Sequence, residues 1–228
     1  QGFSNENWQT MAELGWLGVS IPEAHGGFGG NQIDTMILME AFGKGLVLEP
    51  FFASTVLGAK AIADGGNEEL KTQMLPGVVD GSRQLTFAYA EPQSRFDLED
   101  IVTRAQEDGD GYIINGHKSM VLHAASAHQI VVSTRTSGGQ ADQAGISLFL
   151  VDTDADGVEI TSFPTVDGQQ AAEIKLEGVK VSNSKLLGEL GGGYNLLNAV
   201  ATDGILALAA EAVGAMEILY KDTVDYTQ

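Results

Sequence analysis

The hydrophobic pattern changes its period inside residues 85–122, and this stretch limits the possible folds more than any other. Leu85 to Ala90 is a short apolar run with aromatic side chains, which predicts a buried strand. Pro92 ends the run, because proline has no N–H to donate to a β-ladder. Three more short strands, separated by glycine-containing turns, are predicted at residues 101–106, 112–115 and 118–122. The stretch therefore predicts a meander within an all-β domain.

The pattern is helical on both sides of this region, with apolar side chains three or four positions apart. Helices are expected at residues 5–18, 31–44, 51–63 and 67–79, and a long one after residue 193. Expected N-caps are Asn5 or Asn7, Asn31 and Asn67, and Pro76 is expected to end or kink its helix. Further strands are expected at residues 130–135, 146–152, 158–163, 171–181 and 186–188.

These elements predict an α+β fold in three parts. Residues 1–84 form an N-terminal α-helical domain, and residues 85–190 form a middle β-sandwich or barrel domain. Residues 191–228 form the first helix of a truncated C-terminal helical domain, because the chain starts at Gln1 without a methionine and ends in a helical pattern without a stop signal.

Composition excludes several classes of function. The chain has 12 basic and 31 acidic residues, a net charge of −19, so nucleic acid and an anionic membrane are not expected as partners. No apolar run approaches the roughly 20 residues of a membrane-spanning helix, so no such helix is expected. Cysteine is absent, which excludes disulfides and thiol chemistry and fits a cytoplasmic protein.

Two motifs carry a resemblance to a known family. The strand that runs into Glu91-Pro92 is followed by GDGYIINGHK at residues 109–118. Together they resemble the middle domain of the acyl-CoA dehydrogenase family, and the resemblance extends over essentially the whole chain. The wording AYAEPQSRFD at residues 88–97 is most similar to the small subunit of pimeloyl-CoA-type dehydrogenases. The resemblance implies FAD as cofactor, an acyl-CoA as substrate, and α,β-desaturation of the acyl chain.

The resemblance also implies a set of site residues, several of which depart from the family pattern. Ala90 stands where the family has a threonine that meets the flavin edge. Leu122 stands where the family has a second flavin-contacting threonine, and it cannot donate a hydrogen bond. The implied cofactor-binding residues are Phe87, Tyr89, Ala90, Met120, Val121 and Leu122. Arg95 and Phe96 replace a Gly-Ser pair on the substrate side, where Arg95 could meet a phosphate and Phe96 obstructs close approach.

No catalytic residue is assigned. In some relatives a glutamate on the last helix removes the α-proton, and Gly204 occupies that position here. In most relatives the glutamate lies in the C-terminal domain, beyond Gln228. Glu211 is expected to be structural or exposed. His117, His123 and His128 share one β region without ligand spacing to other groups, so no metal site is expected.

Two functions remain open. The first is an FAD-dependent acyl-CoA dehydrogenase, here a truncated chain that lacks the catalytic glutamate and is inactive alone. The second is a non-catalytic scaffolding subunit of a hetero-oligomeric dehydrogenase with a degenerate FAD site. In both, homo- or hetero-oligomers are expected to form through the missing C-terminal domain. A third possibility, a free-standing lipid- or acyl-binding module, is supported by no specific motif in the sequence.

Overall fold

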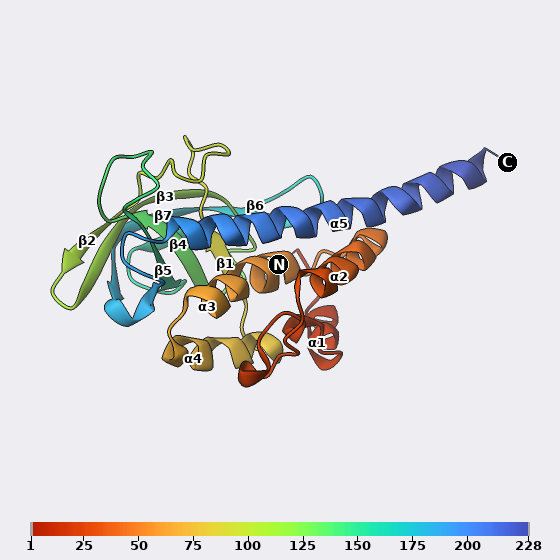
Figure 1. Ribbon diagram of the computed structural model, residues 1–228. Helices are drawn as coiled ribbons and strands as arrows, with labels where there is room; N and C mark the ends of the chain where they lie inside the picture. The colour runs from red at the N-terminus through yellow and green to blue at the C-terminus, as the bar shows by residue number, and fades with distance from the viewer. Residues whose placement is uncertain (1, 228) are drawn as a thin grey trace.

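The computed structural model describes residues 2–227 and shows a layer of N-terminal helices packed against a twisted sheet (Figure 1). A long C-terminal helix, α5 (Tyr194–Tyr226), starts beside the sheet, crosses the helical layer and projects beyond it (Figure 1). The predicted α+β class and its order of helices, strands and a final helix are confirmed. The domain limits at residues 84 and 190 stay a prediction.

The helical layer contains α1 (Asn5–Glu13), α2 (Gln32–Gly45), α3 (Lys60–Gly65) and α4 (Glu68–Val79). A π-helical segment, η3 (Phe52–Ala59), runs directly into α3, and two short 3-10 turns, η1 (Trp16–Gly18) and η2 (Glu23–His25), follow α1. The predicted caps Asn31 and Asn67 are confirmed, since each side chain accepts a backbone N–H of the first turn. Ser4, instead of Asn5 or Asn7, caps α1.

Pro76 was predicted to end or kink its helix, and it does not end it. Pro76 lies inside α4, which continues to Val79. Its own carbonyl still accepts the N–H of Asp80 at 3.1 Å. The buried side chains of Met74, Leu75 and Val78 hold both sides of the proline against the core, so packing outweighs the one lost hydrogen bond.

The β region is one mixed sheet of eight strands. The strands are β1 (Leu85–Ala88), β2 (Arg104–Asp108), β3 (Gly111–Leu122), β4 (Gln129–Arg135), β5 (Ile146–Asp152), β6 (Val158–Pro164), β7 (Gln170–Ser182) and β8 (Leu186–Leu187). Their order is β6-β7-β3-β2-β4-β5-β8, and β1 pairs in parallel with β4. Between β1 and β8 the only helical segment in the described chain is the short turn η4 (Asn183–Lys185), so no helical crossover connects the parallel pairs.

The two short strands expected at 112–115 and 118–122 form one long strand, β3. Its register against β7 shifts twice, between Ile114 and Gly116 and between Lys118 and Val121. A bulge of this kind re-aims the side chains that follow it. The sequence pattern predicted a break at Asn115-Gly116, whereas the backbone keeps pairing and bends there.

Three apolar clusters hold the layers together. One lies between the helical layer and one face of the sheet and includes Leu75, Leu85 and Leu148. The second covers the other face of the sheet, around Ile114 and Phe149. The third joins α1, α2 and η3 to α5. The end of β1 reaches the junction of these layers, which places its last residues beside α5.

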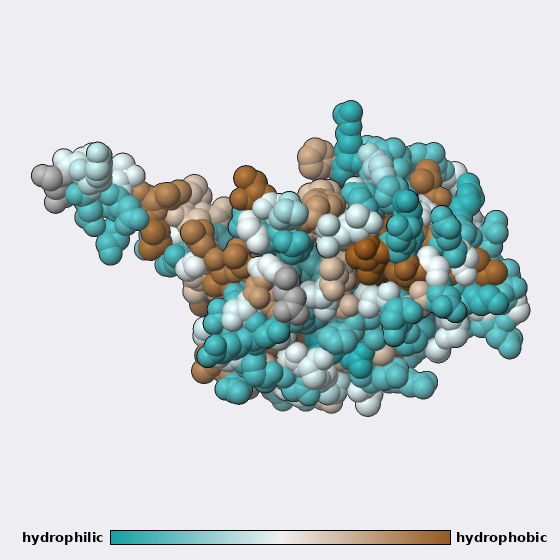
Figure 2. Space-filling view, turned by 180° about the vertical axis from the view of Figure 1, so that it is seen from behind, coloured by the Kyte–Doolittle hydropathy of each residue, from teal (hydrophilic) through white to brown (hydrophobic). Residues whose placement is uncertain are grey.

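Helix α5 packs against α2 at very short range. A side chain at Gly214 would overlap the carbonyl oxygen of Glu40, and one at Gly43 would overlap the carbonyl oxygen of Glu211. The buried residues of α5 end at Gly214, and the remainder projects with apolar side chains exposed, visible as brown patches on the arm in Figure 2.

Helix α5 corrects the expectation that no apolar run approaches membrane-spanning length. It has 33 residues, and an 18-residue window within it has a mean hydropathy of 1.5. By length and composition alone it could cross a membrane, but the core helix of a water-soluble protein passes the same test. Its first half packs against η3 and the sheet and its middle packs against α2, while 28% of the apolar window is buried.

Candidate functional site

A cleft of about 560 Å³ lies where the ends of β1 and β3 meet α5 and η3. The sheet contributes aromatic and apolar side chains, and α5 contributes small and apolar ones. Most of its wall is formed by Phe52, Leu57, Phe87, Tyr89, Ala90, Met120, Ala201, Gly204, Ile205 and Leu208. A cleft of this volume with mostly apolar walls and few polar groups is the usual form of a small-molecule site.

The structure brings six of the eight sequence-predicted site residues together. Phe87, Tyr89, Ala90 and Met120 line the inner part of the cleft, and Arg95 and Phe96 stand at its rim. Val121 and Leu122 do not line it. Val121 is buried in the sheet cluster, and Leu122 lines a separate hollow on the other side of Leu208.

The bulge in β3 explains why Met120 reaches the cleft while its neighbour does not. Met120 has a φ of 55° in the left-handed region, and its side chain is 54% exposed. Val121 resumes the pairing with Ala172 and turns into the core. The left-handed residue thus presents a flexible thioether to the cleft, where it can contact a ring.

The aromatic wall is formed by Phe87 and Tyr89 in an edge-to-face contact, with ring centroids 5.8 Å apart. Phe87 is 3% exposed, and burial raises the pKa of the Tyr89 phenol. The phenol is therefore neutral at physiological pH. The wall offers an apolar, aromatic surface with a single hydroxyl group.

At the rim, Arg95 has a φ of 50° and Phe96 is 96% exposed. Both lie in the loop between β1 and β2, with Arg95 at a backbone conformation that ordinarily favours glycine. Among the described residues, Arg95 is the one basic residue that lines the cleft, so it is the group able to meet an anionic part of a ligand there.

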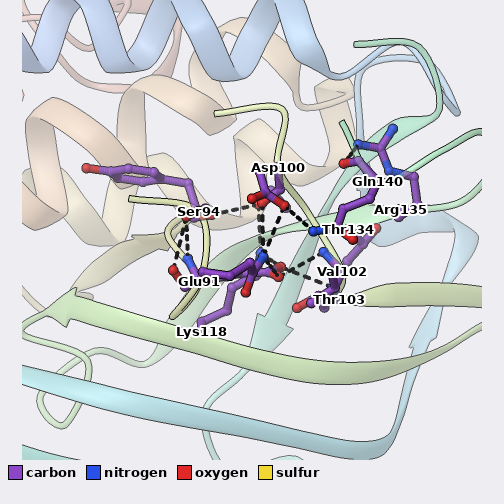
Figure 3. Close-up of polar contacts among 12 residues, drawn as sticks. Glu91, Ser94, Asp100, Val102, Thr103, Lys118, Thr134, Arg135 and Gln140 are labelled. Atoms are coloured by element: carbon purple, nitrogen blue, oxygen red, sulfur yellow. Dashed lines mark hydrogen bonds and ion pairs between the residues drawn. The ribbon is translucent and has the colours of Figure 1, made fainter. Parts of the chain in front are cut away.

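A buried ion pair fixes this loop to the sheet (Figure 3). The Lys118 ammonium lies 2.7 Å from Glu91 Oε1, both side chains are fully buried, and Lys118 also donates to Ser133 Oγ at 2.9 Å. Glu91 accepts the backbone N–H groups of Val102 at 2.8 Å and Thr103 at 3.1 Å. One carboxylate therefore ties β1, β3 and the start of β2 together.

The charge state of the pair follows from its surroundings. Desolvation acts to raise the pKa of Glu91, but the charge and hydrogen bond of Lys118, with donors from Thr103 and Gln93, outweigh it and hold the pKa below its ordinary value. Burial lowers the pKa of Lys118 against the opposing attraction of Glu91. Glu91 is fully engaged as an anion, so it is not available as a base toward the cleft.

A second buried cation, Arg135, holds the neighbouring loop. Its guanidinium is 1% exposed and donates to the carbonyl oxygens of Glu99, Gln140, Asp142 and Ala144 at 2.6–2.9 Å. Backbone carbonyls instead of a carboxylate satisfy the charge. The loop after β4 is therefore clamped to the segment that leads into β2.

The α5 wall offers no carboxylate to the cleft. Its contributions are Ala201, Gly204, Ile205 and Leu208. Apart from Glu91, no acidic residue of the described chain lines the cleft. Glu211 is partly buried and lines the separate hollow with Leu122, so it faces away from Tyr89 and Met120. No group of three metal-ligating side chains occurs among residues 2–227, so the structure offers no metal site there.

Sequence reasoning missed the partnership of Glu91 with Lys118 and the role of Arg135. Both members of the pair stand inside the two motifs that carried the family resemblance, and a lysine among apolar strand residues is a signal for a buried partner. His25, at the end of η2, is 9% exposed, and its Nε2 lies 3.8 Å from Glu68 Oε2 of α4.

Comparison with known proteins decides the family. Residues 86–179 match the family described as acyl-CoA dehydrogenase, middle domain, and residues 1–82 match acyl-CoA dehydrogenase, N-terminal domain. The chain belongs to the acyl-CoA dehydrogenase family. The finer resemblance to the small subunit of pimeloyl-CoA-type dehydrogenases stays a prediction.

Individual relatives agree with this assignment. The chain is 32% identical to the probable acyl-CoA dehydrogenase YngJ of Bacillus subtilis, over 99% of this chain and 61% of that protein. Among solved structures, an FAD-dependent dehydrogenase has a TM-score of 0.90 at 25% identity, covering 99% of this chain and 63% of that one. A chain of the ChsE4-ChsE5 complex from Mycobacterium tuberculosis has a TM-score of 0.86 at 26% identity, covering 98% and 57%.

The chain spans about 60% of the length of the relatives that it matches. The activity, substrates and partners of those whole proteins are therefore not transferred with the family name. The family assignment suggests two ligands for the cleft, FAD and an acyl-CoA, and the walls of the cleft can be compared with both.

Proposed function

We propose that this chain is part of an acyl-CoA dehydrogenase-type flavoprotein, and that the cleft between β1, β3 and α5 receives the flavin ring of FAD and the thioester end of an acyl-CoA. The observation that supports this most is the convergence of Phe87, Tyr89, Ala90 and Met120 on one cleft. These are four of the residues that the family resemblance implies for the cofactor.

The walls of the cleft offer apolar surface for the face of a flavin ring but few hydrogen-bonding groups for its polar edge. Phe87, Tyr89 and Met120 supply flat or flexible apolar surface. Hydrogen-bond donors are few, since Ala90 carries none on its side chain and Leu122 does not line the cleft. Arg95 and the phenol of Tyr89 are the side-chain donors left to hold such a group, because Glu91 is paired with Lys118 and the Ser119 hydroxyl donates to Glu173 at 2.7 Å.

A bound flavin would supply the acceptor for the hydride that leaves the β-carbon of the acyl chain. This chain's own residues would orient the ligands and exclude water. Phe52 and Leu208 close the inner end of the cleft, and Arg95 at the rim offers positive charge toward a phosphate. The base that removes the α-proton would be supplied from outside the described residues, because no free carboxylate lines the cleft.

A second function is favoured by the same departures from the family pattern. The chain would then be a non-catalytic subunit that supports an active partner in a hetero-oligomeric dehydrogenase. The missing donor at Ala90 and the position of Leu122 outside the cleft support this proposal. The similarity to a chain of the ChsE4-ChsE5 complex also supports it. In both functions we expect homo- or hetero-oligomers and, for a cysteine-free chain, a reducing compartment such as the cytoplasm.

Flavin retention separates the two functions. The protein is purified once alone and once after co-expression with a second dehydrogenase chain, and bound FAD is measured by its visible absorbance. Stoichiometric FAD in the protein alone supports the flavoprotein and removes the scaffold. FAD that appears only in the co-expressed complex, at one per pair of chains, supports the scaffold. A complex with neither FAD nor affinity for acyl-CoA contradicts both.

A further inference from the structure

The loop between β1 and β2 presents a fully exposed phenylalanine at the mouth of the cleft. Phe96 is 96% exposed, yet it belongs to the residues that line the cleft. Its ring therefore stands in solvent beside the opening and leaves the interior of the cleft free. A ligand that extends out of the cleft on this side would pass the face of the ring.

The chain on both sides of Phe96 is anchored, so the ring is held outward. Two residues before it, Ser94 is 4% exposed, and its hydroxyl oxygen accepts the backbone N–H of Glu91 at 2.9 Å (Figure 3). Two residues after it, Leu98 packs against the apolar cluster between the helical layer and the sheet. The N–H of Asp97 donates to the carbonyl oxygen of Ser94 at 2.8 Å and closes the turn between these anchors. The fold thus fixes the position of the exposed ring.

Arg95 is exposed beside this ring and is held in a left-handed conformation. Its φ is 50°, which costs energy for a residue with a side chain. Conformations of this kind cluster at ligand sites, where the surrounding structure maintains them. The guanidinium is planar, and its fork of N–H donors matches two oxygens of a phosphate. The rim therefore places an aromatic face and a phosphate-binding cation at adjacent positions.

The charges around these two residues decide what they can bind. Asp97 and Glu99 lie in the same loop. Asp100 lies there too, and its Oδ1 accepts the side-chain N–H of Gln140 at 2.6 Å. These carboxylates oppose an anion that depends on charge alone. Stacking of an aromatic base on Phe96 needs no charge and is not opposed in this way. The rim therefore favours a ligand with both a base and a phosphate over free phosphate.

The ligands proposed for the cleft carry this combination. FAD and an acyl-CoA both end in an adenine nucleotide, which joins a flat base to phosphates through a ribose. Each ligand has its reactive part at the opposite end from this nucleotide. If that reactive part lies in the cleft of about 560 Å³, the nucleotide extends from the mouth, where Arg95 and Phe96 stand.

We propose that Phe96 and Arg95 form a rim clamp for the adenine nucleotide of a cleft ligand, with the base stacked on the Phe96 ring and a phosphate paired with the Arg95 guanidinium. The inference rests on the proposed function, because it needs a nucleotide-bearing ligand in the cleft. It gives a binding role to the two residues that replace the Gly-Ser pair of the family pattern.

The rim clamp is tested first with nucleotide fragments on a Phe96→Trp variant of the assembled, purified protein. Tryptophan keeps an aromatic face at this position, and a base that stacks on it quenches its fluorescence. We expect saturable quenching by adenosine 3′,5′-bisphosphate, the nucleotide end of CoA, and by ADP, the nucleotide end of FAD. The tighter of the two identifies which ligand the rim clamp holds. Ribose phosphate has no base and should not quench. Absence of saturable quenching by both nucleotides would overturn the proposal.

Two controls show whether the position matters. Trp8 and Trp16 are present in every variant, so titration of the wild type gives their contribution. Tyr226→Trp places the new indole on the arm of α5, at a residue that is 92% exposed. We expect no saturable quenching in either protein. Equal saturation in Tyr226→Trp would mean that any exposed indole gives the signal, which contradicts the rim clamp.

Further variants test the two residues by calorimetry. Phe96→Ala and Arg95→Gln should each weaken binding of the preferred nucleotide by about tenfold, because one removes the stacking and the other removes the charged phosphate contact. Both positions are exposed, so the variants should keep the circular dichroism spectrum of the wild type. Arg104→Gln removes the same charge from an exposed position of β2 and should leave the affinity nearly unchanged. Equal losses in Arg104→Gln and Arg95→Gln would show that only net charge matters and would exclude the clamp.

FMN and butyryl-pantetheine distinguish a failure of the clamp from a failure of the proposed function. They carry the flavin and the thioester without the adenine nucleotide, so they report on the cleft alone. We expect Phe96→Ala to leave their affinities unchanged. Binding of either one, without nucleotide quenching of Phe96→Trp, would sink the clamp and leave the proposed function standing. Nucleotide quenching without binding of either one would support the clamp and count against the flavin and thioester in the cleft.

Discussion

The carboxylate of Glu91 is the residue on which the geometry of the cleft depends. It accepts backbone N–H groups from Val102 and Thr103 and pairs with Lys118, all away from water. A buried pair of this kind adds little stability compared with an apolar pair of the same shape, but breaking it is costly. Its effect is therefore to specify where the loop between β1 and β2 lies.

Glu91→Gln should lower the free energy of unfolding by about 3–5 kcal/mol, because it leaves the Lys118 charge buried without a counter-ion. The double variant Glu91→Gln, Lys118→Met should lose less than the sum of the two single variants, by about 1–3 kcal/mol. Urea unfolding of all four proteins measures this coupling. Strictly additive losses would show that the two side chains act independently.

The same pair predicts a dependence of stability on pH. The folded-state pKa of Glu91 lies below its ordinary value of 4.5, so its contribution is fully present above pH 4.5 and is lost as the pH falls further, through the folded-state pKa. The wild type should therefore lose more stability than Glu91→Gln when the pH is lowered from 5 to 3, because the Glu91 carboxylate becomes protonated below its ordinary pKa of 4.5. Parallel profiles of the two proteins would contradict this assignment.

Arg135 holds the loop after β4 through hydrogen bonds to backbone carbonyl oxygens instead of through an ion pair. Arg135→Met removes the donors of four backbone carbonyls, which should cost about 3 kcal/mol or more. Hydrogen exchange should accelerate first at residues 137–145. The exposed Arg104 in β2 provides the control, and Arg104→Met should leave both stability and exchange nearly unchanged. Equal effects of the two variants would mean that charge, and not the carbonyl contacts, is responsible.

At the scale of elements, the contact between α2 and α5 determines the position of the helix that forms one wall of the cleft. Gly43 and Gly214 let the two backbones approach until each glycine faces a carbonyl group of the other helix. This contact fixes the angle of α5, and with it the positions of Ala201 and Gly204 on the cleft wall.

Gly214→Ala should destabilise the protein by about 1–3 kcal/mol, because the added methyl overlaps the Glu40 carbonyl and must push the helices apart. Gly45→Ala, at the end of α2, is the matched control. Its added methyl would meet Val47 Cγ2 at an ordinary 3.6 Å, so it should be neutral or stabilising by up to about 1 kcal/mol. A harmless Gly214→Ala would mean that the helices are not in contact there.

The elements could be predicted from sequence where the signal was local. The caps Asn31 and Asn67 and the change of period at Leu85 are readable from a few neighbouring residues. The course of α4 through Pro76 was not readable, because distant packing decides it. Likewise, the left-handed backbone of Met120 lies in a register shift that pairing with the distant strand β7 sets, and no local pattern predicts it.

The candidate site was predictable only in part for the same reason. Motif positions identified Phe87, Tyr89, Ala90 and Met120, and the structure brings their side chains to one cleft. Nothing local predicts that Leu122 lies outside this cleft, since its position depends on the course of β3 against β7.

At the scale of the whole molecule, α5 forms both a wall of the cleft and an exposed apolar surface. Its first half forms the cleft wall, and its second half projects with Met216, Leu219 and Tyr220 more than half exposed. A surface of this kind is typical of an interaction face. We therefore expect that cleft ligands and assembly are linked through this one helix.

The central claim is that the cleft of this chain receives the flavin, and one pair of variants tests it most directly. Ala201→Trp fills the cleft from α5, whereas Ala209→Trp places the same side chain on an exposed position of the same helix. FAD content per chain is measured in the assembled, purified protein. The account predicts that Ala201→Trp loses the FAD and Ala209→Trp retains it. Full FAD in a folded Ala201→Trp variant would contradict the claim.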